Sequence, residues 1–154
     1  MIDLRDANKP LDEGMIIEEG SLAGAMAPLL PAAFGVSETS RRWALAEGRV
    51  GGPSSFQTYI LLANPDATAD AVVVATFLRT SGAPVAKTLV VPAGGRLTIT
   101  TGPGSMVPQL ANESFGVMLS ADRPVFAERA MYSNAGGVFW AAGSAATATR
   151  MPFP

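Results

Sequence analysis

Short hydrophobic runs alternate along most of the chain with clusters of glycine, proline and small polar residues. The clearest case is the pair 56–63 and 70–79, two runs rich in β-branched and aromatic residues with the turn-forming residues 64–69 between them. Runs of this length and composition are typical of β-strands. We therefore predict a pair of antiparallel core strands here, around which the rest of the chain is organised.

The same rhythm predicts further strands on both sides of this pair. At 96–101, polar residues alternate with Leu97 and Ile99, which indicates one buried face and one face in contact with water. A long loop over 102–113 is expected to cross between sheets. The remaining predicted strands are 42–47, 85–91, 114–120 and 124–132, and a final pair lies on either side of residues 143–144. A break at 121–123 separates strand 114–120 from strand 124–132.

Seven or eight short strands favour an all-β fold, an antiparallel β-sandwich of immunoglobulin-like or jelly-roll-like type, with a small barrel as the alternative. A chain of 154 residues is expected to form one domain, which we place at 41–154. Residues 1–40 form an acidic N-terminal extension. Ser21 could cap a short helix over 21–30. We expect the extension to pack on its own domain or on a neighbouring subunit.

Composition supports a folded β protein and argues against one class of binding partner. Hydrophobic residues make up 48% and charged residues 16%, with 16 glycines and 12 prolines. Such a chain is too apolar for disorder and too rich in turn formers for a helical bundle. The net charge of -2 provides no basic field, so nucleic acid is not an expected partner.

The residue types also restrict the chemistry. The chain has no cysteine and no histidine, which excludes disulfides, thiolate or imidazole metal sites and histidine-based catalytic triads. Asn64, Asp66 and Asp70 share one predicted turn, but their spacing does not match a calcium-binding EF-hand. We predict no enzyme activity, no cofactor and no metal.

No apolar run approaches the roughly 20 residues that a membrane-spanning helix requires, so no membrane span is expected. The first residues lack the basic and then apolar pattern of a signal peptide. Either the chain is cytoplasmic, or it is a piece of an exported protein whose signal lies elsewhere.

Three charged residues lie within apolar strands: Glu47, Glu128 and Arg129. Glu128 and Arg129 must point to opposite faces, so one of them should face the core or an interface. We predict a structural ion pair, such as Glu47 with Arg129 across neighbouring strands, because an unpaired buried charge is costly. The alternative is that Glu47 and Glu128 form a glycosidase pair, which would need a separation of roughly 5–10 Å in a cleft.

Four aromatic residues in predicted strands are candidates for a ligand-binding face: Trp43, Tyr59, Tyr132 and Trp140. Together they could form a flat platform on which a sugar stacks. Strand aromatics more often belong to the core, which is the reading that we favour.

Several phrases of the sequence point to known families. They are WALAEG at 43–48, TYILLANP at 58–65, VPAGGR at 91–96, PVFAERAMY at 124–132, and Trp140. Together they resemble a β-sandwich module of unknown function that is found in tandem in large exported bacterial proteins. The opening phrase and the strand order also resemble the sensory rhodopsin transducer family of small oligomeric all-β bacterial proteins. The resemblance covers about 42–145.

The two resemblances imply different settings for the chain. The first implies an extracellular or cell-surface location, and the second implies a cytoplasmic homo-oligomer. We predict a non-enzymatic structural module that associates with itself through its N-terminal extension and its sheet edges into a homo-oligomer, filament or coat. The alternative is a binding module for carbohydrate or a signalling protein partner, acting through loops or an aromatic face.

Overall fold

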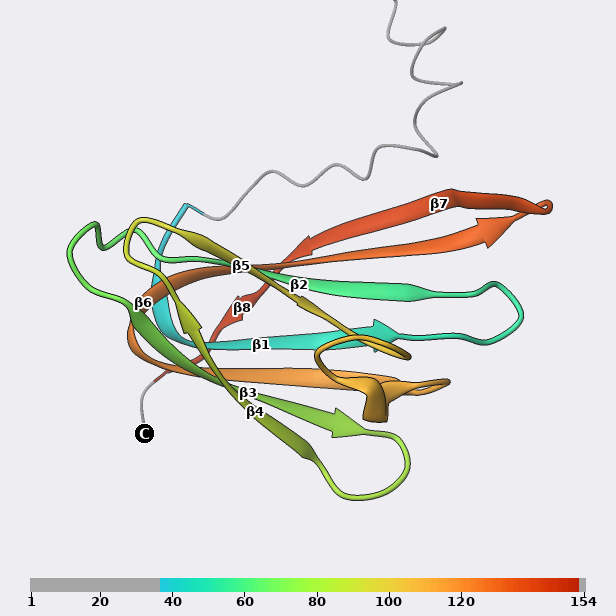
Figure 1. Cartoon of the computed structure of the whole chain (residues 1–154), viewed down its shortest axis with the longest axis horizontal. Helices are drawn as coiled ribbons and strands as arrows, with labels where there is room; N and C mark the ends of the chain where they lie inside the picture. Colours follow the sequence, from blue (N-terminus) through green and yellow to red (C-terminus); the bar gives the residue numbers. More distant parts are fainter. Residues whose placement is uncertain (1–36, 153–154) are drawn as a thin grey trace, which may run out of the picture.

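The computed structural model describes residues 37–152, so the N-terminal extension and its predicted helix at 21–30 lie outside the described residues. This part of the chain is almost entirely β-structure (Figure 1). The only helical segment within it is the short 3-10 helix η2 (Pro108–Leu110), and no helix within 37–152 has the length and hydropathy to span a membrane. The strands are β1 (Ser40–Arg49), β2 (Gln57–Ala63), β3 (Ala71–Arg79), β4 (Val85–Val91), β5 (Arg96–Thr100), β6 (Ser114–Ala135), β7 (Val138–Thr147) and β8 (Thr149–Arg150).

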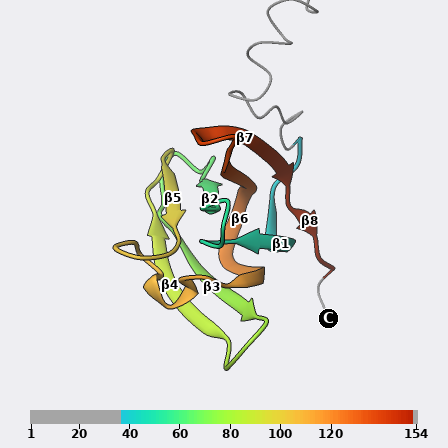
Figure 2. The ribbon, with the colours of Figure 1, turned by 90° about the vertical axis from the view of Figure 1, so that its right-hand side faces the viewer.

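The strands form two layers that share β6. The first half of β6 pairs with β1 and β3 in a first layer of order β4-β3-β6-β1-β8. The second half pairs with β2 and β7 in a second layer of order β5-β2-β6-β7. The end-on view in Figure 2 shows the two layers with β6 running between them. The predicted all-β, sandwich-like fold is therefore confirmed.

The bend in β6 joins the layers. The sequence predicts two strands with a break at 121–123, whereas the structure has one strand that turns back on itself there (Figure 1). Side chains secure the bend from outside, because Asp122 accepts a hydrogen bond from the Val72 amide at 2.8 Å and Arg123 pairs with Asp66 at 3.1 Å. The break in the pattern therefore marks a change of layer within a strand.

The other predicted strands lie within two residues of the observed ones, apart from the last pair. Residues 143–144 were expected to form a turn, but they lie inside β7. The turn is instead at Gly136 and Gly137, whose φ angles are 57° and 79°. Two successive residues with positive φ are what a tight hairpin requires, and glycine adopts this conformation without steric cost. The connection from β5 to β6, which contains η2, crosses between layers, as predicted for 102–113.

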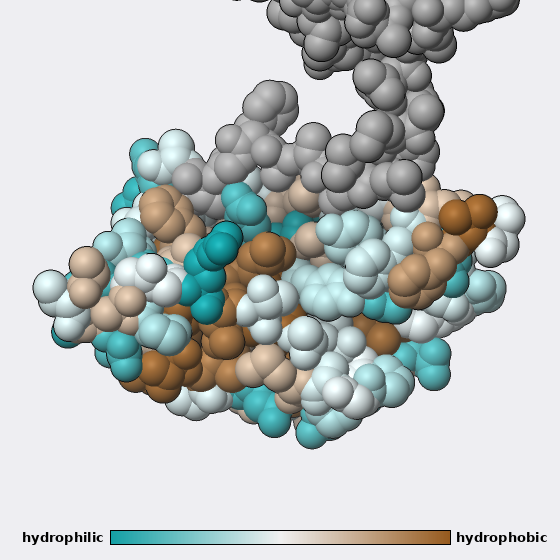
Figure 3. All heavy atoms as spheres, turned by 45° about the horizontal axis from the view of Figure 1, so that its top comes forward, coloured by the Kyte–Doolittle hydropathy of each residue, from teal (hydrophilic) through white to brown (hydrophobic). Residues whose placement is uncertain are grey.

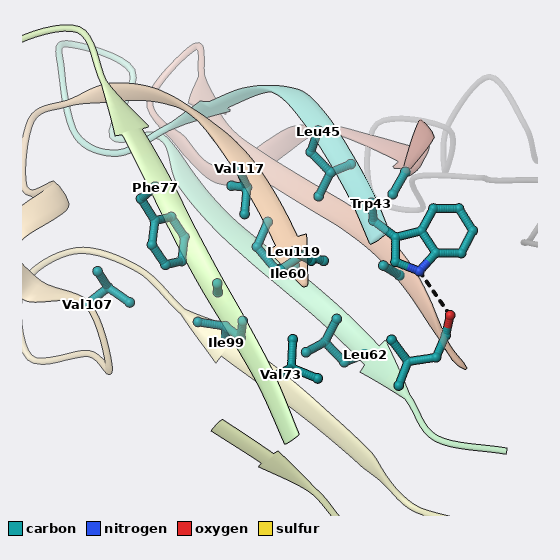
Figure 4. Close-up of a cluster of buried hydrophobic side chains, with 14 of the residues drawn as sticks. Trp43, Leu45, Ile60, Leu62, Val73, Phe77, Ile99, Val107, Val117 and Leu119 are labelled. Carbon is teal, nitrogen blue, oxygen red and sulfur yellow. Dashed lines mark hydrogen bonds between the residues drawn. The ribbon is translucent and has the colours of Figure 1, made fainter. Parts of the chain in front are cut away.

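The core lies between the layers and is built from the inward-facing residues of strands β1 to β6 (Figure 4). In β2 the inward residues are Ile60 and Leu62, and in β3 they include Val73 and Phe77. Trp43 on β1 is 2% exposed, and its indole nitrogen donates to the carbonyl oxygens of Val125 at 2.9 Å and Ser40 at 3.1 Å. Val125 lies just after the bend in β6, so the hydrogen bond from Trp43 holds this part of β6 against β1.

We expect Trp43→Phe to lower the free energy of unfolding by about 2–4 kcal/mol, because it removes both hydrogen bonds and leaves a cavity. The matched control is Trp140→Phe. The indole nitrogen of Trp140 has no partner within residues 37–152, so this change should cost less than about 1 kcal/mol. Chemical denaturation of both variants measures the difference, and equal losses would contradict the role given to Trp43.

Candidate functional site

Three of the four predicted face aromatics meet on the outer surface of the second layer. The rings of Tyr132 on β6 and Trp140 on β7 are stacked, with centroids 4.7 Å apart. Tyr59 on β2 contacts both edge-on, at 6.0 Å and 6.1 Å. Phe139, 63% exposed, stacks on Trp140 at 5.0 Å. We call these four residues the aromatic cluster.

Strand register explains how the cluster forms. Tyr132 lies directly opposite Gly143, and a Cβ at Gly143 would come within 3.2 Å of the Tyr132 ring. The glycine therefore leaves room for the ring to lie across β7. Trp140 has a φ of 52° and donates its amide hydrogen to Asn134 at 3.0 Å, which places its side chain next to Tyr132. Figure 3 shows hydrophobic atoms at the right-hand end of the visible surface, where the β6–β7 hairpin ends.

Trp43 does not belong to this face. Its side chain lies on the same side of β1 as that of Leu45 and points into the core (Figure 4). The interpretation of Trp43 as a ligand-binding residue is therefore wrong, because its ring and its indole nitrogen are both used inside the protein. The core alternative holds for this residue, whereas Tyr59, Tyr132 and Trp140 are each only partly buried.

A cleft of about 520 Å³ lies beside Tyr59, at the end of the sandwich where the β1–β2 turn meets the β5–β6 loop. Both segments lie at the right-hand end of the molecule in Figure 1. Phe56 and Tyr59 contribute the aromatic part of the lining. The polar side chains of the lining are Ser55, Gln57, Thr100, Thr101, Ser105 and Asn112.

Tyr59 connects the cleft with the aromatic cluster. Its hydroxyl donates to the side-chain oxygen of Gln57 at 2.7 Å. Partial burial, together with the neighbouring Tyr132, raises the pKa of Tyr59 above its ordinary value of 10.0. The phenol therefore stays protonated at neutral pH and acts as a hydrogen-bond donor, not as an anion.

The structure brings Glu47 and Arg129 together, with an oxygen of Glu47 3.3 Å from a guanidinium nitrogen of Arg129. They lie in opposite layers and not on neighbouring strands of one layer. The Arg129 side chain is only 6% exposed and also donates to Ser144 at 3.3 Å, whereas that of Glu47 is 72% exposed. Burial of Arg129 therefore accounts for most of the desolvation cost of this ion pair.

Glu128 points the other way, to the outer surface of the second layer. It lines a second depression of about 250 Å³ with Leu61, Arg96 and Phe126. Glu47 lines a different one with Arg129. The two carboxylates thus line separate depressions, and this arrangement gives no support to the glycosidase alternative.

The carboxylate oxygens of Asp66 and Asp70, in the turn at 64–70, accept hydrogen bonds from the protein itself. One oxygen of Asp66 accepts hydrogen bonds from the hydroxyl and amide of Thr68 and from the amide of Ala69. These bonds, that of the Thr68 hydroxyl foremost, lower the pKa of Asp66 below its ordinary value. Asp70 accepts a hydrogen bond from the amide of Ala93. Within residues 37–152, no three acidic side chains are grouped as a metal would require.

Sequence reasoning missed the cleft, because its polar residues belong to segments that were interpreted only as turns. The signal was the enrichment of glycine, serine, threonine and asparagine in two connections, 50–56 and 101–112. That these connections meet at one end of the sandwich follows from the sheet order, which could not be read from either segment alone.

Comparison with known proteins supports the fold. The sequence matches no protein-family model. It also matches no curated protein sequence. The structure is similar to the crystal structure of Thermotoga maritima 1070, with a TM-score of 0.60 and 12% identity over 71% of this chain and 93% of that one. It also resembles the Anabaena sensory rhodopsin transducer, with a TM-score of 0.49 and 21% identity over 63% of this chain and 99% of that one. The likeness to the Thermotoga protein shows a related β fold.

We expect Arg129→Ala to lower the free energy of unfolding by about 2 kcal/mol or more, since it removes a buried stem and three polar contacts. Glu47→Gln should cost less than about 1 kcal/mol, because the exposed carboxylate is largely solvated and the amide can still accept a hydrogen bond. Chemical denaturation of each variant tests this order. A greater loss for Glu47→Gln would contradict it.

Proposed function

We propose that this protein is a non-enzymatic assembly module that associates with further copies of itself. The observation that carries the proposal is an apolar outer face on the first layer. Four large hydrophobic side chains, each 37–51% exposed, lie on the outer side of β3 and β4. They are Val72, Val74, Leu78 and Val90.

Strand register places these four side chains on one side of the layer, and we call this surface the valine face. Val72 lies directly opposite Val90 on the neighbouring strand, and Val74 lies one step along β3 on the same side. The other strand positions on this side are mainly small or hydroxylated: Ala44, Thr76, Ala86, Thr88, Gly116, Met118 and Ser120, with Arg42 towards the β1 side. A contiguous apolar patch of this kind on a soluble domain is typical of an interaction surface.

The edges of the first layer are less suited to self-association than this face. β4 is the edge of the first layer, and its Lys87 lies opposite the buried Ala75, on the core-facing side of the strand. An inward-pointing lysine on an edge strand opposes pairing with a second strand. The other edge of the layer is β8, which has only two residues.

The occupant that we propose for the valine face is the same face of a second copy. Two β-sheets with apolar surfaces pack face to face about 10 Å apart, and a two-fold axis lets one patch be its own partner. The extension supplies a second apolar element, because residues 20–37 contain no charged side chain. We propose that this segment adds to the contact between copies.

We expect Val74→Lys to weaken self-association at least about a hundredfold, because it would bury an ammonium group between two apolar sheets. Thr98→Lys is the matched control, since Thr98 is an exposed β-branched strand residue on the outer side of the second layer. Sedimentation velocity of the full chain and both variants tests this expectation. If Val74→Lys and Thr98→Lys behave alike, the valine face is not the contact.

A chain that begins at Ser37 separates the two contributions. All core residues of the described domain lie within 43–148, so this shorter chain retains the whole core. If it still associates, and Val74→Lys abolishes that association, the valine face is the main contact. If it is a monomer while the full-length Val74→Lys variant associates normally, the extension alone makes the contact.

A further inference from the structure

The cleft beside Tyr59 has the size of a small-molecule site. Its volume of about 520 Å³ falls within the range of roughly 300–1,000 Å³ that is usual for ligand pockets. It lies on the opposite layer and at the loop end, away from the valine face, so what it binds is a separate question from how the protein assembles.

The lining is polar but carries no formal charge. None of the lining residues is Asp, Glu, Lys or Arg. The cation Arg49 stacks on the ring of Phe56, with its guanidinium carbon 4.9 Å from the ring centroid. A cationic ligand would find no opposite charge in this lining, and the guanidinium of Arg49, which borders the cleft at Phe56 and Gly52, is already engaged with the Phe56 ring. The lining therefore favours a neutral ligand.

The loop amides are also unavailable to an anion. The amides of Gly51, Ser55 and Phe56 donate to backbone oxygens within the β1–β2 turn. The amide of Gly52 points to the side-chain oxygen of Asn112 at 3.4 Å. A phosphate-binding loop needs several free amides, and in this turn they are already used.

Several side-chain groups remain available for a hydroxylated ligand. Gln57 uses its oxygen to accept from Tyr59, and Asn112 uses its oxygen for Gly52, which leaves both amide nitrogens as donors. Ser55 contributes a hydroxyl to the same lining. Sugar hydroxyls both donate and accept, so they suit a mixture of amide and hydroxyl groups.

Aromatic surface completes the chemistry of the cleft. Phe56 and Tyr59 line it, and Tyr59 continues into Tyr132 and Trp140 of the aromatic cluster. The carbon face of a sugar ring is apolar and packs well on such rings, while its hydroxyls remain at the edge. Neutral amides next to aromatic rings thus match both surfaces of a sugar.

The backbone holds the cleft in one shape. An isolated bridge joins Gly51 with Phe56, and another joins Thr101 with Val107. Three residues other than glycine have a positive φ within 37–152: Ser55 and Asn112 in the cleft, and Trp140 in the aromatic cluster. Such conformations cost about 1 kcal/mol or more each and concentrate at functional sites. A preformed site reduces the entropy lost on binding.

We propose that this cleft binds a neutral sugar unit, with Tyr59 and Phe56 as the stacking surface and Ser55, Gln57 and Asn112 as hydrogen-bonding partners. The inference is independent of self-association. It can hold in a monomer, and it can fail in a protein that assembles as described above.

The test is saturation-transfer difference NMR on the full chain, which reads the ligand signals and works for large assemblies. The probes are glucose, galactose, mannose and N-acetylglucosamine, each as its methyl glycoside and its disaccharide, with methyl phosphate as the charged probe, whose methyl protons give the signal. We expect at least one sugar to bind saturably and phosphate not to bind. Saturable binding by no sugar, or by phosphate alone, would overturn the proposal.

Two glycine variants locate the site. Gly104 lines the cleft with a φ of 71° and open space around an added Cβ, and Gly94 has a φ of 60° in the β4–β5 turn, outside the cleft lining. Asparagine tolerates this backbone conformation, so both Gly104→Asn and Gly94→Asn should fold. We expect Gly104→Asn to weaken sugar binding at least tenfold and Gly94→Asn to leave it within twofold. Equal affinities in the two variants would refute the assignment.

Discussion

The fold depends on the bend of β6, because this one strand belongs to both layers. A sandwich made of two separate sheets is held together only by side-chain packing, whereas here the backbone itself passes from one layer to the other. The indole of Trp43 satisfies the carbonyl of Val125 just after the bend, in a region where water does not reach. Burial of that carbonyl without a partner would be costly, so a single buried tryptophan stabilises the path that the chain takes.

This architecture gives the molecule two outer faces of different chemistry. The first layer presents valine and leucine among small and hydroxylated residues, and the second presents aromatic rings that lead to a polar cleft. The same alternation produces both, since each strand turns every second residue outward. Because the core separates the two faces, the proposed self-association through the first layer would leave the cleft on the second layer open.

Alternation and turn residues were sufficient to predict most of the fold. Strand 85–91 and the layer-crossing loop follow from local pattern, because β-branched runs and glycine or proline clusters act over a few residues. The hairpin at Gly136 and Gly137 was misplaced, because the pair Gly143-Ser144 has a similar composition and lies only a few residues further on. At Gly143 the glycine serves side-chain packing under Tyr132, which no local pattern reveals.

The candidate site was less predictable, because it depends on contacts between distant segments. Tyr59 neighbours Ile60 in a strand whose even positions are buried, so its outward direction could have been read from the sequence. The same reasoning assigns Trp43 to the core, since it lies two residues from the buried Leu45 and the bulge in β1 comes only after Leu45. The meeting of the 50–56 and 101–112 segments requires the sheet order itself.

The central claim, that the chain assembles through an apolar face, is tested most directly by the mass of the untreated full-length protein in solution. Light scattering over a wide range of concentrations gives that mass without any variant. The account predicts a mass of at least twice the 15.9 kDa of one chain, which falls towards 15.9 kDa only on strong dilution. A constant mass of 15.9 kDa at every concentration would contradict it.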